Sequence, residues 1–510
     1  MSNPTITTIA PAADLCIVDS QNHFDLGQQF FAQHFAGTDG PTLIHHRKAW
    51  RHWVGSHYAT VSDGDLEALI WKSLPSCKEK KGDELVPLKP KSSLVSATMS
   101  GLKAVAHVSS TIEQPCWLTD GPSNVIAFQN GLLDLDDFQA SGDCNLRPHT
   151  PQWFSANCLP HDLKPFASCP NWLKFLSDIF DGDGERISAL QQWFGYCLTN
   201  DNSQQKAAIL IGPPRSGKGT TISVLSAVLG HENVASLSLE DLGGQFGLHP
   251  LVGKLAAIVD EAQLGRFGSQ SQVLRTLKTI TGGASQTINR KNVDSLSNVR
   301  LNARFTLTMN ELPRLPDASA ALVSRFLVIP YLNSYVGKED TRLLDRLLAE
   351  VSGITTWALH GLQQLNANGG FVQPSVGQSA LDDFEELSSP TKVFVRECCV
   401  VGDGKTMSLA EAEVAWKTWC QANSHEVGKL HDLGRKLRAV VPRVKTSREQ
   451  TLGVVMRSYC GIGLSEAYRD YLELRSVLPT TKPVQLARDY SEAHGQPDFD
   501  TFTAMNSFDF

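Results

Sequence analysis

Four short segments in the middle of the chain, rich in apolar and β-branched residues, have the length and residue types of strands. They lie at 207–211, 255–259, 303–309 and 326–330. The first run is followed, a few residues later, by an apolar segment at 221–225 that suits a helix. Buried strands that alternate with helices are typical of an α/β domain. We therefore predict an α/β core with a parallel sheet and flanking helices.

Apolar residues recur at helical spacing before the first of these strands. In residues 171–180 they are mostly aromatic and share one helical face, and a second helical pattern covers residues 185–199. These patterns predict a mostly helical N-terminal domain at 21–200. Residues 1–20 lack apolar periodicity and are expected to be a flexible lead. The charged run at 78–82 is expected to be an exposed loop.

The segment between the first strand and its helix has the composition of a phosphate-binding loop. Its residues are Gly212, Pro213, Pro214, Arg215, Ser216, Gly217, Lys218, Gly219 and Thr220. Glycines let backbone N–H groups close around phosphate oxygens, the helix N-terminus attracts negative charge, and Lys218 would neutralise the outer phosphates. The context of strand, loop and helix therefore predicts binding of a nucleoside triphosphate, ATP, together with Mg²⁺.

One position departs from the usual loop. Gly219 stands where a serine or threonine normally holds the magnesium ion. Thr220, Thr221 or a water molecule must then take that role, and Thr220 together with Asp260 is the predicted metal site.

Acidic and amide residues follow the next two predicted strands. Asp260 and Glu261 end the run at 255–259, and Asn310 follows the run at 303–309. Asp260 is predicted to hold magnesium and Glu261 to polarise the attacking water. Asn310 is suited to orient that water or to contact the outermost phosphate.

Two arginines could stabilise charge on the phosphate of a neighbouring subunit, which requires a ring. Arg325 begins the strand at 326–330, whereas Arg314 lies in a loop. We favour Arg325 because placement at a strand edge fixes its direction better. Either residue could instead form a surface ion pair.

Residues 286–293 alternate apolar and polar positions around a basic tip, which predicts a hairpin. In a ring, Arg290 and Lys291 at such tips would line the central hole and contact DNA. The alternative is a surface hairpin with two solvated charges.

In order and spacing, these motifs resemble the superfamily 3 helicases, and within them the primase–helicase family of phages and plasmids that is shared with satellite phages and poxviruses. The matching elements are the loop at 212–220, Asp260-Glu261, the basic hairpin, the segments at 308–313 and 324–330, and upstream and downstream segments at 130–135, 169–172, 195–199 and 354–362. The resemblance implies a hexameric ring of AAA+ type at 201–370, ATP hydrolysis between subunits and translocation on single-stranded DNA.

The resemblance also implies that residues 391–462 form a winged-helix domain. This segment carries twelve Lys and Arg against seven Asp and Glu, a local charge of +5 as twelve minus seven. A helical pattern at 431–440 turns Arg435, Lys436 and Arg438 outward, where they could contact DNA phosphates. The alternative is a domain that only packs on the ATPase or on a partner. Residues 463–510 are expected to be an acidic, flexible tail.

Composition limits the remaining possibilities. The net charge of −7 argues against capture of nucleic acid over the whole surface, so DNA contacts must be local. Cys144, Cys158, His161 and Cys169 lack the short paired spacings of zinc ligands, so free thiols are expected. No apolar run reaches the ~18 residues of a membrane span, and the start of the chain does not resemble a secretory signal. We expect a protein of the bacterial host cytoplasm.

The sequence thus favours a replicative DNA helicase of a phage, prophage or plasmid that acts on single-stranded and forked DNA. A nucleotide-switched initiator or loader that binds DNA without unwinding it would share the carboxylates and the arginine. Only the predicted basic hairpin favours the helicase over the initiator or loader. A small nucleotide kinase is disfavoured because such proteins place the loop near the N-terminus. About 120 residues precede Asn130 and carry no acidic constellation for priming, so a separate primase is an expected partner.

Overall fold

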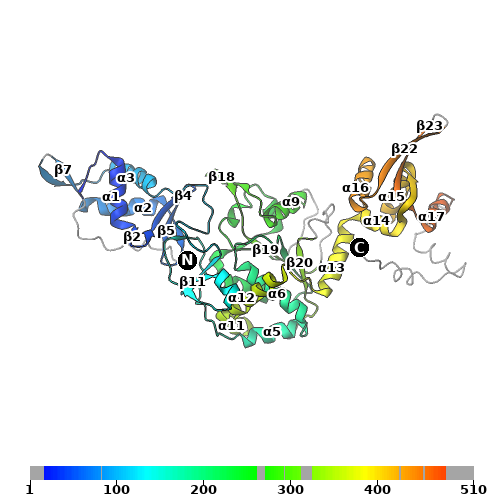
Figure 1. The fold of residues 1–510 in the computed structure, drawn as a ribbon, viewed down its shortest axis with the longest axis horizontal. Coiled ribbons are helices and arrows are strands. Elements are labelled where there is room, and N and C mark those ends of the chain that lie inside the picture. The colour runs from blue at the N-terminus through cyan, green and yellow to red at the C-terminus, as the bar shows by residue number, and fades with distance from the viewer. Residues whose placement is uncertain are drawn as a thin grey trace. The chain divides into compact units, whose positions relative to one another are not determined.

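The computed structural model describes residues 17–81, 83–260, 270–291, 293–311, 324–423, 425, 427–451 and 454–477. These residues form two compact units, one reaching to Leu381 and the other beginning at Asp382 (Figure 1).

A five-stranded sheet forms the centre of the first unit. Its order is β15-β16-β19-β14-β20, and every neighbouring pair is parallel. The bounds are Val234–Ser236 for β15, Ala256–Val259 for β16, Arg304–Met309 for β19, Ala207–Ile211 for β14 and Phe326–Pro330 for β20. The predicted parallel α/β core is therefore present, and it is consistent with a phosphate-loop ATPase.

Helices precede, connect and follow these strands (Figure 1). They are α5 (Pro170–Phe180), α6 (Gly184–Cys197), α7 (Lys218–Leu229), α8 (Leu239–Gly243), α9 (Gln270–Thr281), α11 (Leu343–Leu348), α12 (Val351–Asn368) and α13 (Ser375–Ser388). The aromatic stripe of α5 lies in the core, as expected, where Trp172 packs against Phe194 of α6 and Trp357 of α12. Helices α6 and α12 approach closely, because a side chain at Gly195 would overlap backbone atoms of α12.

The predicted basic hairpin is present in this unit as the antiparallel pair β17 (Gln286–Arg290) and β18 (Val293–Val299).

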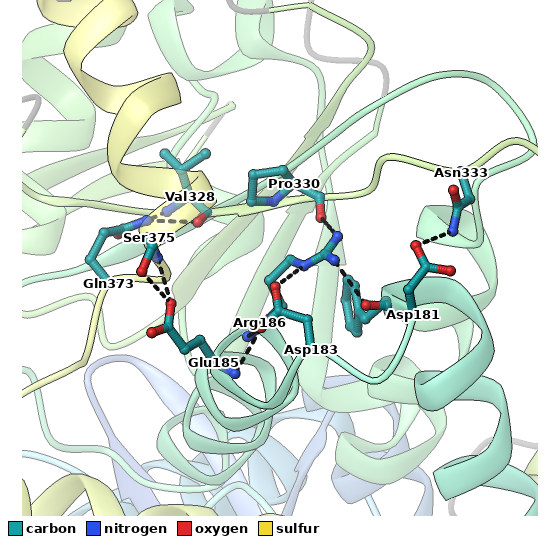
Figure 2. A network of polar contacts seen from close by, with 10 residues as sticks. Asp181, Asp183, Glu185, Arg186, Val328, Pro330, Asn333, Gln373 and Ser375 are labelled. Carbon is teal, nitrogen blue, oxygen red and sulfur yellow. Dashed lines mark hydrogen bonds and ion pairs between the residues drawn. The ribbon is translucent and has the colours of Figure 1, made fainter.

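Strand β20 lies at the edge of the central sheet, and Gln373 covers that edge. The Gln373 side chain donates to the Val328 oxygen at 2.8 Å and accepts from the Val328 nitrogen at 3.3 Å (Figure 2). At Val328 this side-chain amide makes the two hydrogen bonds that a neighbouring strand would otherwise make.

The prediction of a mostly helical N-terminal domain at 21–200 holds only in part: α5 and α6 are helices, as predicted, but short strands are interspersed with the helices that precede them. The helices are α1 (His23–His34), α2 (Asp63–Ser73), α3 (Ser92–Val105) and α4 (Leu135–Ser141). The strands are β1 (Ile17–Val18), β2 (Ala36–Gly37), β3 (Gly40–Pro41), β4 (Leu43–His46), β5 (Ala49–Trp53), β6 (Tyr58–Val61), β7 (Lys78–Lys81), β8 (Glu84–Pro87), β9 (Cys116–Trp117), β10 (Val125–Phe128), β11 (Gly131–Asp134), β12 (Leu146–Arg147) and β13 (Trp153–Phe154).

The strands were missed for physical reasons that differ from place to place. Strand β5 buries Trp50 and His52 in alternation, but its polar and histidine content hides the period of two. The charged run expected to be a loop is a hairpin of β7 and β8, and β1 pairs in parallel with β7. Ile17 and Val18, within the segment expected to be a flexible lead, therefore form strand β1.

The second unit contains a three-stranded antiparallel sheet in the order β21-β23-β22. Its elements are α14 (Pro390–Cys398), β21 (Cys399–Ser408), α15 (Leu409–Ala422), α16 (Leu433–Val440), β22 (Lys445–Thr451), β23 (Val454–Leu464) and α17 (Glu466–Val477). Phe394, Trp416, Trp419 and Leu437 are buried in its own core.

The tail predicted to be flexible at 463–510 includes a helix, α17, at Glu466–Val477. Helix α17 is part of the second unit, because the Tyr468 hydroxyl donates to the Ala415 oxygen at 3.2 Å and the Tyr468 ring meets Phe394 edge to face. The rest of the expected tail, 478–510, lies outside the described residues.

Candidate nucleotide site

The loop between β14 and α7 requires glycine at two positions. Gly212 has φ +153° and Gly217 has φ +99°, both in the region that side chains disfavour. A Cβ at Gly212 would overlap the carbonyl oxygen of Tyr331, and one at Gly217 would lie 3.1 Å from Ile179. These glycines allow the loop to curl tightly at the end of its strand.

Arg215 adopts a left-handed conformation in the same loop, with φ +58°. For a residue with a side chain, this conformation costs on the order of 1–3 kcal/mol and persists only where the surroundings hold it. Such strain is typical of binding loops, and the contacts that hold it here are described below.

Lys218, the first residue of α7, is a buried cation with 8% of its surface exposed. Its Nζ donates to the oxygens of Gly212 at 2.6 Å and Pro213 at 2.8 Å, and to Asn310 Oδ1 at 3.3 Å. Burial lowers the pKa of Lys218, and the nearby carboxylate of Asp260 acts in the opposite direction. A buried ammonium whose hydrogen-bond acceptors are neutral oxygens would be stabilised by an anion, so the site fits a phosphate group.

The sheet brings Asp260 and Asn310 to the same edge as the loop. Asp260 follows β16 and Asn310 follows β19, and β19 lies between β16 and β14. Thr308 donates its hydroxyl hydrogen bond to Asp260 Oδ1, while Asn310 accepts from Lys218. The carboxyl ends of three adjacent parallel strands thus converge on one site, as expected for ligand binding in open α/β sheets. Glu261 lies outside the described residues.

The two threonines at the start of α7 differ in their surroundings. Thr221 is buried, and its hydroxyl donates to the Gly217 oxygen at 3.0 Å and accepts from the Tyr331 hydroxyl at 3.0 Å. Thr220 is half-buried, and its hydroxyl makes no hydrogen bond within the described part of the chain. Thr220 therefore fits a magnesium site with Asp260 better than Thr221 does, since hydroxyl and carboxylate oxygens suit this hard cation.

Arg325 lies at the amino end of β20, whereas the phosphate loop follows the carboxyl end of the adjacent parallel strand β14. It precedes β20, as predicted, and it donates to the Lys278 oxygen, to Thr281 Oγ1 at 3.1 Å and to Gln205 Oε1 at 3.1 Å. Lys278 and Thr281 belong to the last turn of α9, whose carbonyl groups attract cations. The competing Arg314 lies outside the described residues.

The residues predicted to contact DNA lie on other elements. In the hairpin, Arg290 folds back and donates from Nε to the Asp294 oxygen at 2.9 Å, whereas Lys291 is exposed. In α16 two of the three basic residues are exposed and the third is half-buried. They are Arg435, paired with Asp432 at 3.1 Å, Lys436, half-buried, and Arg438, which donates to Thr446 Oγ1 at 3.2 Å.

The residues considered as zinc ligands have other surroundings. His161 Nε2 lies 2.9 Å from the Val228 oxygen, and burial raises the pKa of the Cys169 thiol to about 11. Across the residues that the structure describes, no group of three or more His, Cys, Asp or Glu is placed to hold a metal ion. In the same residues no helix is both long and apolar enough to span a membrane.

Sequence reasoning missed two sets of residues around the site. Tyr331, Ser334 and Tyr335, which follow β20, contact the phosphate loop through backbone and hydroxyl groups that leave no motif. Arg304 at the start of β19 is buried, donates to the Asp201 and Asn302 oxygens, and lies over the Tyr196 ring at 4.7 Å. An arginine at the head of an apolar strand is the only signal of this anchor.

Two family models match parts of this chain. Residues 28–181 match the family described as "D5 N terminal like", and residues 210–325 match DUF5906, a family of unknown function. Together these domains are typical of the phage and plasmid primase–helicase proteins of helicase superfamily 3. The resemblance drawn from the motifs is therefore confirmed.

Two individual relatives are more distant. "Uncharacterized mitochondrial protein ymf21" of Marchantia polymorpha is 22% identical over 131 residues, which cover 24% of this chain and 73% of that protein. The apo structure of the "NrS-1 C terminal region (305-718)" is 12% identical with a TM-score of 0.48, covering 87% of this chain and 100% of that chain. A second apo structure of that region, the A form, is 13% identical with a TM-score of 0.43, and the match covers 81% of this chain and 94% of that chain. At these scores the likeness does not establish a common fold.

Proposed function

We propose that this protein is an ATP-dependent replicative DNA helicase of a phage, prophage or plasmid. The observation that carries the proposal is the convergence of Lys218, Asp260 and Asn310 at the carboxyl ends of adjacent parallel strands. The matches to domain families that are typical of superfamily 3 primase–helicases support DNA unwinding as the use of this ATPase site.

Each residue of the site has a proposed role. The loop amides and Lys218 bind the phosphates, and Thr220 and Asp260 hold Mg²⁺, which neutralises charge on the phosphate oxygens. Asn310 orients the water or contacts the outermost phosphate, and Glu261 accepts the water's proton. Arg325 acts on the nucleotide of the neighbouring subunit, which its position at the amino end of β20, away from its own loop, supports.

DNA binding is assigned to two places. Arg290 and Lys291 of the β17–β18 hairpin would follow single-stranded DNA inside a hexameric ring. The second unit has the element order expected of a winged helix, which supports phosphate contacts by Arg435, Lys436 and Arg438 of α16. A separate primase and a bacterial host cytoplasm complete the proposal.

The test measures ATP hydrolysis and strand separation on a forked DNA. Glu261→Gln should abolish hydrolysis, and Arg290→Ala/Lys291→Ala should hydrolyse ATP without unwinding. If the wild type hydrolyses ATP but never separates strands in any assembly state, the protein is an initiator or loader instead. Hydrolysis that survives Glu261→Gln would refute the assigned base.

A further inference from the structure

The segment after β20 runs along the phosphate loop and contacts it at both ends and in the middle. The loop lies between Ile211 and Thr221, and the contacting segment is 331–335. Five residues far from the loop in sequence thus border almost its whole length.

Tyr331 holds the two ends of the loop. Its backbone nitrogen donates to the Ile211 oxygen at 2.7 Å, where the loop begins, and its hydroxyl donates to Thr221 Oγ1 at 3.0 Å, in the first turn of α7. Tyr331 and Thr221 are each 1% exposed, so water cannot replace this bond. Thr221 passes the constraint on, because its hydroxyl donates to the Gly217 oxygen.

Ser334 and Tyr335 hold the middle of the loop. Ser334 Oγ donates to the Pro214 oxygen at 3.0 Å, and the Tyr335 nitrogen donates to the Arg215 oxygen at 2.9 Å. The second bond fixes the residue with the left-handed backbone. With these carbonyl oxygens turned toward segment 331–335, the loop is held in its strained form.

The same segment is anchored on its other side to the turn between α5 and α6. Asn333 Nδ2 donates to Asp181 Oδ2 at 2.8 Å, and the Tyr335 hydroxyl donates to the Asp178 oxygen at 2.6 Å. Arg186 ties Pro330 to this turn, donating to the Pro330 oxygen at 3.2 Å and to Asp183 at 2.7 Å (Figure 2). The segment therefore has a rigid support from which to hold the loop.

We propose that residues 331–335 form a strap that positions the phosphate loop for the nucleotide, with Tyr331 and Ser334 as positioning residues. The inference rests on the proposed nucleotide site. The strap keeps the loop in its binding conformation before the ligand arrives, so that the ligand does not bear the cost of ordering it. It also engages the Thr221 hydroxyl, which leaves Thr220 as the threonine whose hydroxyl is available for the metal.

The first measurement is the affinity of the full-length protein for fluorescent mant-ADP with Mg²⁺. Tyr331→Phe and Thr221→Val each remove one side of the same hydrogen bond and should raise the Kd about 3- to 10-fold. Thr221→Val also removes the hydrogen bond to Gly217, so it should have the larger effect of the two. The double variant should bind no more weakly than Thr221→Val, because the Tyr331–Thr221 bond is already lost in that variant. Ser334→Ala should raise the Kd about 2- to 5-fold.

Thr355→Val is the matched control. Thr355 is a buried helical threonine that donates to the carbonyl four residues earlier, as Thr221 does, but it lies in α12 and does not contact the loop. It should leave the Kd unchanged even if it lowers the melting temperature. An unchanged Kd in Tyr331→Phe and Ser334→Ala, with only a lower melting temperature, would reduce the strap to a structural contact.

A second readout needs no nucleotide. Hydrogen exchange of peptides covering 212–221 should quicken in Tyr331→Phe and Ser334→Ala but not in Thr355→Val. If the wild type fails to bind mant-ADP, the proposed function is wrong, while faster exchange of the loop still supports the strap. Unchanged exchange in both strap variants would overturn it.

Discussion

At the scale of single residues, neighbouring threonines of the same type have different environments. Thr221 is buried between Gly217 and Tyr331, whereas Thr220 is half-buried and its hydroxyl has no hydrogen-bond partner among the described residues. The missing hydroxyl at Gly219 can therefore be supplied one residue later.

This assignment predicts that Thr220→Val reduces Mg²⁺-dependent ATP hydrolysis at least about tenfold, because the metal loses a protein ligand. Nucleotide binding in EDTA should stay within about twofold of the wild type, since the phosphate contacts remain. Ser223→Ala, which removes another hydroxyl of α7, is the control. A Cβ at Gly219 would meet no atom within 4 Å, so Gly219→Ser in the Thr220→Val background should restore part of the activity. Equal losses with and without Mg²⁺ would contradict the role.

Histidines in the N-terminal region predict a dependence of stability on pH. Burial lowers the pKa of His46 to about 4, below the ~6.5 of an unfolded chain. The unfolded chain then binds the proton more tightly, so stability is complete above pH 6.5 and falls as the pH decreases through 4. Burial lowers the pKa of further histidines in the same direction, namely His34, His45, His52 and His57.

His46→Gln should therefore lower the melting temperature at pH 7.5 and lessen its fall between pH 7.5 and pH 5. His46 is expected to account for on the order of 1–3 kcal/mol of the decrease in the free energy of unfolding on acidification. Calorimetry at the two pH values measures it, with the exposed His231→Gln as control. A variant as sensitive to acid as the wild type would count against the assignment.

At the scale of elements, β19 illustrates how a strand that ends in the site is fixed at its other end. Arg304 donates to Thr199 Oγ1 at 3.3 Å and to the Asp201 and Asn302 oxygens, and it covers the Tyr196 ring. The start of β19 is thereby tied to the segment after α6, and Asn310 lies at the opposite end of the strand.

Arg304→Leu should destabilise the first unit by about 2–4 kcal/mol, because two part-buried carbonyl oxygens lose a charged donor and the Tyr196 ring loses its cation. Arg304→Lys should not rescue it fully, since an ammonium lacks the planar fork. Differential scanning calorimetry should show a lower melting temperature for the first unit of Arg304→Leu. Arg342→Ala, which changes an exposed arginine, should leave that melting temperature unchanged. A loss below about 0.5 kcal/mol would mean that the anchor is dispensable.

At the scale of the whole molecule, the proposed assembly makes a prediction that no single subunit can show. A subunit with Lys218→Ala cannot hold the phosphates but still offers Arg325 to its neighbour. A subunit with Arg325→Ala retains its loop but offers no arginine. Each variant alone should hydrolyse ATP at a small fraction of the wild-type rate.

Mixing the two variants in equal amounts should restore about a quarter of wild-type hydrolysis, because one in four interfaces combines an intact loop with an intact arginine. Steady-state hydrolysis of the mixture measures this. Mixing Lys218→Ala with Glu261→Gln is the control, since both variants damage the same half of the interface. Absence of recovery would contradict action of Arg325 across subunits.

The sequence predicted the parts of the fold that depend on local pattern. Strands β14, β16 and β20 are predictable because fully buried strands are nearly continuous apolar runs, and β19 because it has the length and residue types of a strand. The loop is predictable because its glycines and Lys218 form a known pattern between a strand and a helix. The N-terminal strands were not predicted, because most of them span only two to four residues, too few to show an alternation of apolar and polar positions.

The sequence by itself determined that this chain has a phosphate loop on a parallel α/β core, and which residues follow each strand. Only the tertiary structure decided that Asp260, Asn310 and Lys218 meet, since strand order is set by long-range pairing that no local pattern encodes. It also decided which threonine is buried and that residues 331–335 border the loop. These contacts use backbone groups and common hydroxyls, so their specificity comes from position in space and leaves no signature along the chain.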